Sequence, residues 1–191
     1  SFNPGGSVKD RAAYQMIRDA IRTGLLAPGK TIIDSTSGNT GVAYSVIGGA
    51  LGYAVTLVMP GNVSWARRKI TEAFGTKLIF SDPMEGSDGA ILLCRKIVEE
   101  NPGVYFYPDQ YSNLANPQAH YDVTAPEIWE QTDGSLDAIV ISVGTGGTIS
   151  GIGRYFKERS PDVLIVGADP EGSIYTADGE GDLHPYFVEG I

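Results

Sequence analysis

Short apolar, β-branched runs alternate with segments of helical periodicity along almost all of this 191-residue chain. The apolar runs predict strands at residues 31–34, 54–59, 77–81, 104–107, 138–142 and 163–169. The periodic segments predict helices at residues 8–22, 42–52, 65–75, 88–101, 121–132 and 152–160. Alternating helices and nearly all-apolar strands are typical of parallel sheets covered by helices on both faces. We therefore predict an α/β fold whose working site lies at the carboxyl ends of the strands.

Composition and charge exclude several classes of function. The formal net charge of −9 argues against nucleic-acid binding, which needs clustered Lys and Arg. No apolar run approaches the roughly 20 residues that span a bilayer, so no membrane association is expected. A single cysteine cannot form an internal disulfide, which favours a reducing, cytoplasmic compartment. The chain starts at Ser1 rather than Met and stops at "VEGI", which suggests truncation at both ends.

The glycine-rich segment "VGTGGT" at residues 143–148 follows an apolar strand and precedes a helix. Consecutive glycines let backbone N–H groups converge on an anion at a helix N-terminus, and Thr145 and Thr148 add hydroxyl donors. The segment is not a P-loop, because no Gly-Lys-Ser/Thr follows it. It is not a dinucleotide fingerprint either, because Ile149 stands where glycine is required. We predict a phosphate cradle here, and a plain tight turn is the alternative.

A second loop between a strand and a helix reads "TSGNTG" at residues 36–41. Its hydroxyls, amide and backbone N–H groups suit a carboxylate bound at a helix N-terminus. Ordinary N-capping by Ser37 or Thr40 explains the same residues equally well. The loop alone leaves both interpretations open.

Lys9 lies in the first turn of the first predicted helix, which Ser7 can cap. The partial positive charge of a helix N-terminus and burial both lower the pKa of a lysine and favour the nucleophilic amine. A solvated surface lysine is the alternative interpretation. A phosphate cradle, a carboxylate loop and a nucleophilic lysine together describe a site for pyridoxal phosphate and an amino acid.

Four motifs spread over the chain strengthen this interpretation: "NPGGSVKDR", "TSGNTG", "DQYSNLANPQAHY" and "SVGTGGTISG". Together they resemble the fold-type II pyridoxal-phosphate enzymes, the cystathionine β-synthase and cysteine synthase group. The resemblance implies a tryptophan synthase β-like α/β fold. It also implies a smaller mobile domain at about residues 40–115. Residues 1–39 and 116–191 would then form part of a larger cofactor-binding domain.

The resemblance also implies roles for individual residues. Lys9 would be linked covalently to the cofactor and would act as base and acid at the substrate Cα. Asn39 would bind the ring oxygen of the cofactor. The cofactor phosphate would be held by Gly144, Thr145, Gly146, Gly147 and Thr148. The amino-acid substrate would be bound by Thr36, Ser37, Gly38, Thr40, Gln110 and Tyr111.

The implied reaction is β-replacement on serine or an activated serine, which forms a C–S bond in cysteine or cystathionine biosynthesis. "DQY" and "VGADPEGSIY" are similar to cystathionine β-synthases, which join serine and homocysteine. "MPGNVSWARR" and "EGSDGAI" look more like cysteine synthases, which use O-acetylserine or O-phosphoserine and sulfide. Alternatives are β-elimination, as in serine and threonine dehydratases, and an inactive structural fragment. The family implies a homodimer acting on small molecules.

The remaining conspicuous residues predict packing rather than chemistry. Cys94 lies in the apolar stripe of a helix, and Trp65 and Trp129 lie on amphipathic helices. His120 and His184 have no second ligand at metal spacing, so no metal site is expected.

Overall fold

The computed structural model describes residues 2–173 and residue 175. It divides into two compact units, one ending at Ala115 and the other beginning at Asn116. The expectation that residues 1–39 belong with residues 116–191 to one larger domain stays a prediction.

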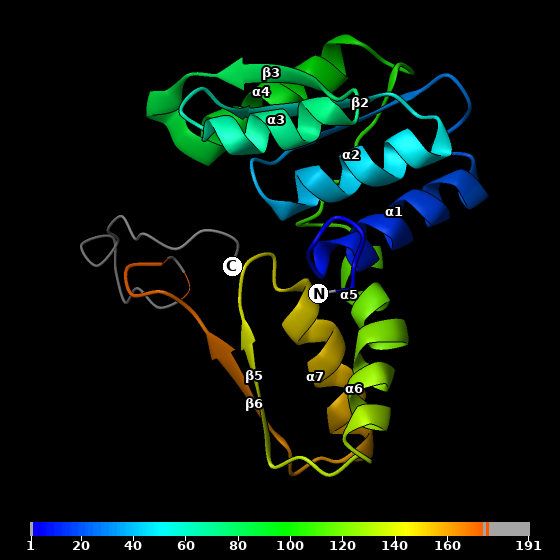
Figure 1. The fold of residues 1–191 in the computed structure, drawn as a ribbon, viewed down its shortest axis with the longest axis vertical. Coiled ribbons are helices and arrows are strands. Elements are labelled where there is room, and N and C mark those ends of the chain that lie inside the picture. Colours follow the sequence, from blue (N-terminus) through cyan, green and yellow to red (C-terminus); the bar gives the residue numbers. More distant parts are fainter. Residues whose placement is uncertain (1, 174, 176–191) are drawn as a thin grey trace. The chain divides into compact units, whose positions relative to one another are not determined.

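The first unit contains one parallel sheet with the strand order β3-β2-β1-β4 (Figure 1). Its strands are β1 (Thr31–Ser35), β2 (Val55–Pro60), β3 (Lys77–Ser81) and β4 (Tyr105–Phe106). Its helices are α1 (Lys9–Thr23), α2 (Asn39–Leu51), α3 (Trp65–Ala73), the short η1 (Pro83–Glu85) and α4 (Gly86–Glu100). The predicted strands and helices are confirmed in order, with shifts of a few residues at their ends.

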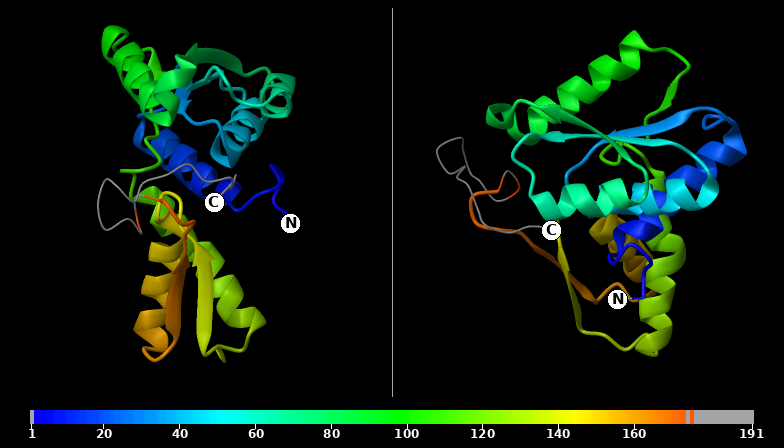
Figure 2. Two further views of the ribbon diagram at one scale, coloured as in Figure 1. Left: turned by 90° about the vertical axis from the view of Figure 1, so that its left-hand side faces the viewer. Right: turned by 45° about the horizontal axis from the view of Figure 1, so that its top comes forward.

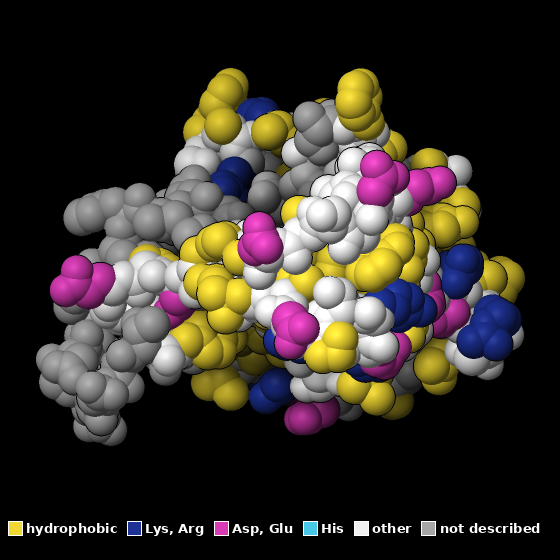
Figure 3. Space-filling model, turned by 90° about the horizontal axis from the view of Figure 1, so that it is seen from below, with side chains coloured by type: hydrophobic (Ala, Val, Ile, Leu, Met, Phe, Trp, Pro, Cys, Tyr) yellow, Lys and Arg dark blue, Asp and Glu magenta, His cyan; other side chains and the backbone are white. Residues whose placement is uncertain are grey.

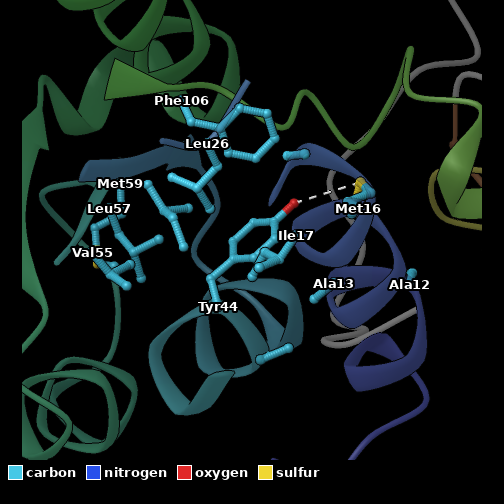
Figure 4. Packing of buried hydrophobic residues seen from close by; sticks show 13 residues of the cluster. Ala12, Ala13, Met16, Ile17, Leu26, Tyr44, Val55, Leu57, Met59 and Phe106 are labelled. Atoms are coloured by element: carbon cyan, nitrogen blue, oxygen red, sulfur yellow. Dashed lines mark hydrogen bonds between the residues drawn. The ribbon is translucent and has the colours of Figure 1, made fainter. Parts of the chain in front are cut away.

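Helices cover both faces of this sheet, as its nearly all-apolar strands require (Figure 2). On one face, α1 and α2 pack through Met16, Ile17 and the fully buried Tyr44 against apolar side chains of β1 and β2 (Figure 4). The Tyr44 hydroxyl donates to the Met16 sulfur at 3.9 Å. On the other face, Cys94 of α4 packs against Ile33 and Val58. The prediction that Cys94 is a packing residue is confirmed.

The strand order places a topological switch point between β1 and β4. From β1 the chain proceeds to β2 and β3 on one side, and then returns through α4 to place β4 on the other side of β1. Ligands of open α/β sheets bind at the carboxyl ends of the strands where the order reverses. The segments that follow β1 and β4 therefore form the expected ligand site of this unit.

The second unit contains the two-stranded parallel sheet of β5 (Ala138–Ser142) and β6 (Leu164–Ala168). Its helices are α5 (Ala115–Ala119), the π-helix η2 (His120–Thr124), α6 (Ala125–Gln131) and α7 (Gly147–Arg159). Trp129, Ile152 and Phe156 pack with Ile141 on one face of the sheet, which confirms the packing role of Trp129. On the opposite face Val140 and Leu164 are 67% and 59% exposed. Helices of the described residues therefore cover only one face of this second sheet.

The exposed side chains and the helices bear on three expectations from the sequence, which concern nucleic-acid binding, the packing of Trp65 and membrane association. Acidic, basic and hydrophobic side chains are interspersed on the face drawn in Figure 3, without a basic stripe. Trp65 is 73% exposed, so the prediction that it packs in a core is wrong. No helix among the described residues has the length and apolar character needed to cross a membrane.

Candidate active site

The loop between β1 and α2 carries most of the predicted substrate-binding residues. Helix α2 begins at Asn39, three residues earlier than predicted, so that Asn39 and Thr40 lie in its first turn. No side chain caps this helix, so N-capping by Ser37 or Thr40, one of the two interpretations left open by the sequence, is not observed. An uncapped helix N-terminus leaves backbone N–H groups available to an anion. This geometry favours the carboxylate interpretation of the loop.

Gln110 reaches the same loop from the segment that follows β4. The hydroxyl of Thr40 donates to Gln110 Oε1 at 2.7 Å, and both side chains are buried. The two residues are 70 positions apart in the chain and meet at the switch point of the sheet. The structure thus brings together two of the predicted carboxylate-binding side chains.

The other predicted residues of this site differ in their surroundings. Thr36 accepts a hydrogen bond from the Gly38 N–H at 3.2 Å, which tightens the loop. Ser37, Gly38 and Asn39 are half-buried. Tyr111 is 59% exposed, unlike its neighbour Gln110, and its role in substrate binding stays a prediction.

Sequence reasoning missed Asp34, which lies beneath this loop. Its carboxylate is 2% exposed and accepts the Ser35 N–H at 2.7 Å. Burial raises the pKa of Asp34 to about 7, against the effect of the Tyr44 hydroxyl and the Ser35 and Gln110 backbone N–H groups. The Asp34 carboxyl group therefore lies where β1, α2 and the Gln110 segment come close together. The charge of the nearby Asp109 raises its pKa further.

We expect Asp34 to make the stability of the full-length protein depend on pH. Between its ordinary pKa of 3.8 and the folded value of about 7, the folded protein keeps a proton that the unfolded chain releases. Stability should therefore fall as pH rises through this window, by up to about 1.4 kcal/mol per pH unit, and level off above it. Asp34→Asn removes the titration and keeps the shape. In urea unfolding from pH 5 to 8, the free energy of unfolding of Asp34→Asn should rise relative to that of the wild type as pH rises. A constant difference between the two free energies would contradict the raised pKa of Asp34.

Lys9 is the first residue of α1 and is half-buried. Burial lowers the pKa of its amine, in the direction predicted from the sequence. Its Nζ has no hydrogen bond or ion pair with any other described residue. The Ser7 hydroxyl accepts the Lys9 N–H at 3.2 Å, although Val8 rather than Ser7 occupies the N-cap position. Lys9 thus has the half-buried, unpaired amine that a nucleophile requires.

The "VGTGGT" segment belongs to the second unit, where it joins β5 to α7. Gly146 has a φ of 79° and stands at the N-cap of α7, which no side chain caps. Thr145 accepts a hydrogen bond from Asn116 Nδ2 at 2.9 Å. The Thr148 hydroxyl lies 3.3 Å from Nε2 of the fully buried His120. The loop conformation is therefore held by side chains of α5 and η2.

Gly147 provides the test of whether this loop fits a phosphate. A Cβ at Gly147 would overlap the Asn116 side chain, so only glycine fits here and no side chain covers the backbone at this position. The loop offers backbone N–H groups at a helix N-terminus and two threonine hydroxyls, a donor set suited to a phosphate dianion. This loop by itself therefore fits the phosphate group of pyridoxal phosphate, and the Lys9 amine by itself fits its aldehyde. No group of three or more His, Cys, Asp or Glu among the described residues has metal-binding geometry, and His184 lies outside them.

A family model described as "Pyridoxal-phosphate dependent enzyme" matches residues 1–191. The chain belongs to the pyridoxal-phosphate dependent enzyme family. Members of this family that resemble it include a cysteine synthase of Aquifex aeolicus, 51% identical over all of this chain and 58% of the relative. A cystathionine beta-synthase of Apis mellifera is 47% identical over all of this chain and 38% of the relative. The chain thus spans between about two fifths and three fifths of these relatives' length.

The solved structures agree with the family assignment. The O-acetyl serine sulfhydrylase isoform 3 of Entamoeba histolytica is 40% identical, with a TM-score of 0.90 over all of this chain and 56% of that chain. The fold predicted for a member of this pyridoxal-phosphate enzyme family, with parallel sheets and helices, is confirmed.

Proposed function

We propose that the full-length protein catalyses pyridoxal-phosphate dependent β-replacement on serine or an activated serine and forms a new C–S bond. The observation that carries the proposal is the buried pair of Thr40 and Gln110 beside the uncapped N-terminus of α2. This arrangement suits an amino-acid carboxylate, in a family whose members use pyridoxal phosphate. The cysteine synthase and cystathionine beta-synthase relatives support the same chemistry.

In this proposal different residues bind the substrate, bind the cofactor and move the substrate proton. Thr36, Ser37, Gly38, Thr40, Gln110 and Tyr111 bind and orient the amino acid. Gly144 to Thr148 bind the cofactor phosphate, and Asn39 binds the cofactor ring oxygen. Lys9 holds the cofactor and then takes the Cα proton of the substrate. The bound cofactor withdraws electrons from Cα, which makes that proton acidic and allows the β-substituent to leave.

Lys9 is suited to moving this proton by its environment. A lysine amine in water is protonated at neutral pH and cannot act as a base. Burial lowers the pKa of Lys9, and the α1 N-terminus disfavours a positive charge in the same place. Both effects raise the fraction of the free amine at neutral pH.

The test is a panel of amino-acid donors with two nucleophiles, run on the full-length protein. Serine, O-acetylserine and O-phosphoserine are each combined with sulfide and with homocysteine, and cysteine, cystathionine and pyruvate are measured. Cystathionine from serine and homocysteine is the expected product of a cystathionine β-synthase-like enzyme. Pyruvate alone would replace the proposal by β-elimination, and no product from any pair would contradict it.

The second candidate is a cysteine synthase that uses O-acetylserine or O-phosphoserine and sulfide. The 51% identity to the Aquifex aeolicus cysteine synthase favours it over the 47% identity to the cystathionine beta-synthase. Cysteine formed from an activated serine, without cystathionine from serine, is the result that selects it. The inactive-fragment alternative is not favoured, because the family model extends over all 191 residues.

The compartment, assembly and domain division are further parts of the proposal. A cytoplasmic location is supported by the single cysteine, which is buried and free. A homodimer and a smaller mobile domain at residues 40–115 are implied by the family resemblance. Sedimentation of the full-length protein tests the dimer.

A further inference from the structure

Arg67 of α3 contacts the substrate loop from outside the predicted site. Its Nη1 donates to the Ser37 carbonyl oxygen at 2.8 Å. The same nitrogen is the heavy atom that a Cβ on Gly38 would meet, at 3.4 Å. The guanidinium thus lies directly against the Ser37–Gly38 peptide. No sequence signal distinguished this arginine from its neighbours.

A hydrogen bond to this carbonyl fixes the direction of a whole peptide unit. The Ser37 carbonyl and the Gly38 N–H belong to one planar trans peptide, so they point in opposite directions. When the carbonyl faces Arg67, the N–H faces away from α3, where it lies 3.2 Å from Thr36 Oγ1. Glycine tolerates rotation of the adjoining peptide at little steric cost, so another contact must select one orientation.

The opposite orientation would harm an anion site. A flipped peptide would direct the Ser37 carbonyl oxygen to the side where the N–H now points. An oxygen there repels a carboxylate, whereas an N–H attracts it. The hydrogen bond from Arg67 carries a full charge, which makes it stronger than a neutral one.

Two neighbours of Arg67 on α3 make contacts of other kinds. Arg68 donates to the Val63 carbonyl at 2.9 Å and to the Gly61 carbonyl, and its guanidinium lies 4.5 Å from the Phe80 ring centroid. Lys69 is exposed and pairs with Glu72 at 2.8 Å. Because α3 is anchored by Arg68, loss of Arg67 removes the contact with the loop and leaves the helix attached.

We propose that Arg67 is a positioning residue that holds the Ser37–Gly38 peptide in the orientation in which its N–H donates to Thr36 Oγ1 and its carbonyl oxygen points away from the bound α-carboxylate of the amino-acid substrate. The inference rests on the proposed function for the identity of the ligand. Its structural part, the order of the loop, does not depend on any ligand.

The experiment compares Arg67→Ala, Arg67→Lys and the control Lys69→Ala in the full-length protein. The first measurement is hydrogen–deuterium exchange of residues 36–41 without cofactor or amino acid. Arg67→Ala should exchange faster than the wild type in this loop, and Lys69→Ala should not. Unchanged exchange in Arg67→Ala overturns the inference whatever the protein's activity.

The second measurement is amino-acid binding, followed by the absorbance of the bound cofactor. Arg67→Ala should weaken binding and raise KM about 10- to 100-fold, with kcat and resting absorbance nearly unchanged. Arg67→Lys should recover part of the affinity, because it keeps a charged donor. If Arg67→Ala reaches half-saturation at the same amino-acid concentration as Lys69→Ala, the inference is overturned. It is also overturned if both Arg67 variants lose the same amount of amino-acid affinity and lose bound cofactor as well.

The two proposals fail in different ways. If the wild type binds no amino acid, the proposed function fails, and the substrate part of the inference fails with it. If the wild type binds and Arg67→Ala binds equally well, only the inference fails.

Discussion

Replacement of Lys9 by alanine should reduce the activity of the full-length protein by at least about 10³-fold, because in the proposed function one amine both holds the cofactor and moves the substrate proton. Burial already lowers the pKa of this lysine, and it has no hydrogen-bond or ion-pair partner among the described residues. Alanine offers neither nucleophile nor base. Cofactor and product are measured in parallel, by absorbance and by the substrate panel.

Two further variants make the Lys9 result specific. Lys9→Arg keeps the positive charge but supplies no usable amine, so it should be as inactive as Lys9→Ala. Lys30→Ala is the control, because Lys30 lies outside the predicted site and is half-buried like Lys9, and its Nζ donates to the Leu25 carbonyl oxygen at 2.8 Å. Borohydride reduction of the wild type should make the link to the cofactor permanent, and the cofactor should then be found on the peptide that contains Lys9. Attachment to a different peptide, or substantial activity in Lys9→Arg, would refute the assignment.

Replacement of Gly151 by alanine should destabilise the second unit by about 3 kcal/mol. A Cβ at this position would come within 3.0 Å of the Pro117 carbonyl oxygen, His120 Cβ and the Tyr121 nitrogen. Two of these atoms belong to the backbone of α5 and η2, so they cannot move aside as a flexible side chain can. Helix α7 would have to separate from η2. Thermal and urea unfolding of the full-length protein measure the loss.

Gly153 supplies a matched control two residues further along α7. A Cβ there would lie 3.6 Å from the nearest Ile165 atom, an ordinary van der Waals contact. Gly153→Ala should therefore stabilise the helix by about 0.5–1 kcal/mol, because alanine loses less backbone entropy than glycine. Equal stability of the two variants would show that α7 does not approach η2 as closely as described.

The order of strands and helices could be predicted because each element carries its own signal. Apolar β-branched runs and helical periodicity marked β1 through β6 and the long helices. The two glycine-rich loops could be located from this order, because each one follows a predicted strand and precedes a helix, the first after β1 and the second after β5. Periodicity could not give the start of α2, because Asn39 and Thr40 resemble capping residues and lie inside the helix.

Features that depend on tertiary contacts had no such signal. The segment after β4 ends in α5 and continues into the π-helix η2, and no periodic pattern in the sequence marked this change. The proximity of Asp34 to Gln110 follows from the return of the chain to β4, which no local pattern reveals. Arg67 and Arg68 are adjacent in the sequence. Only the folded structure shows that Arg67 contacts the Ser37 carbonyl oxygen and Arg68 the Val63 carbonyl oxygen.

The return of the chain to β4 also decides when the substrate site can form. Strand β4 pairs with β1 through only Thr31–Tyr105 and Ile32–Phe106. A growing chain can align β1, β2 and β3 early, but Gln110 arrives 70 residues after Thr40. Closing a loop of that length is slow compared with local contacts. We therefore expect the contact between Thr40 and Gln110 to form late in folding, after β4 has paired with β1.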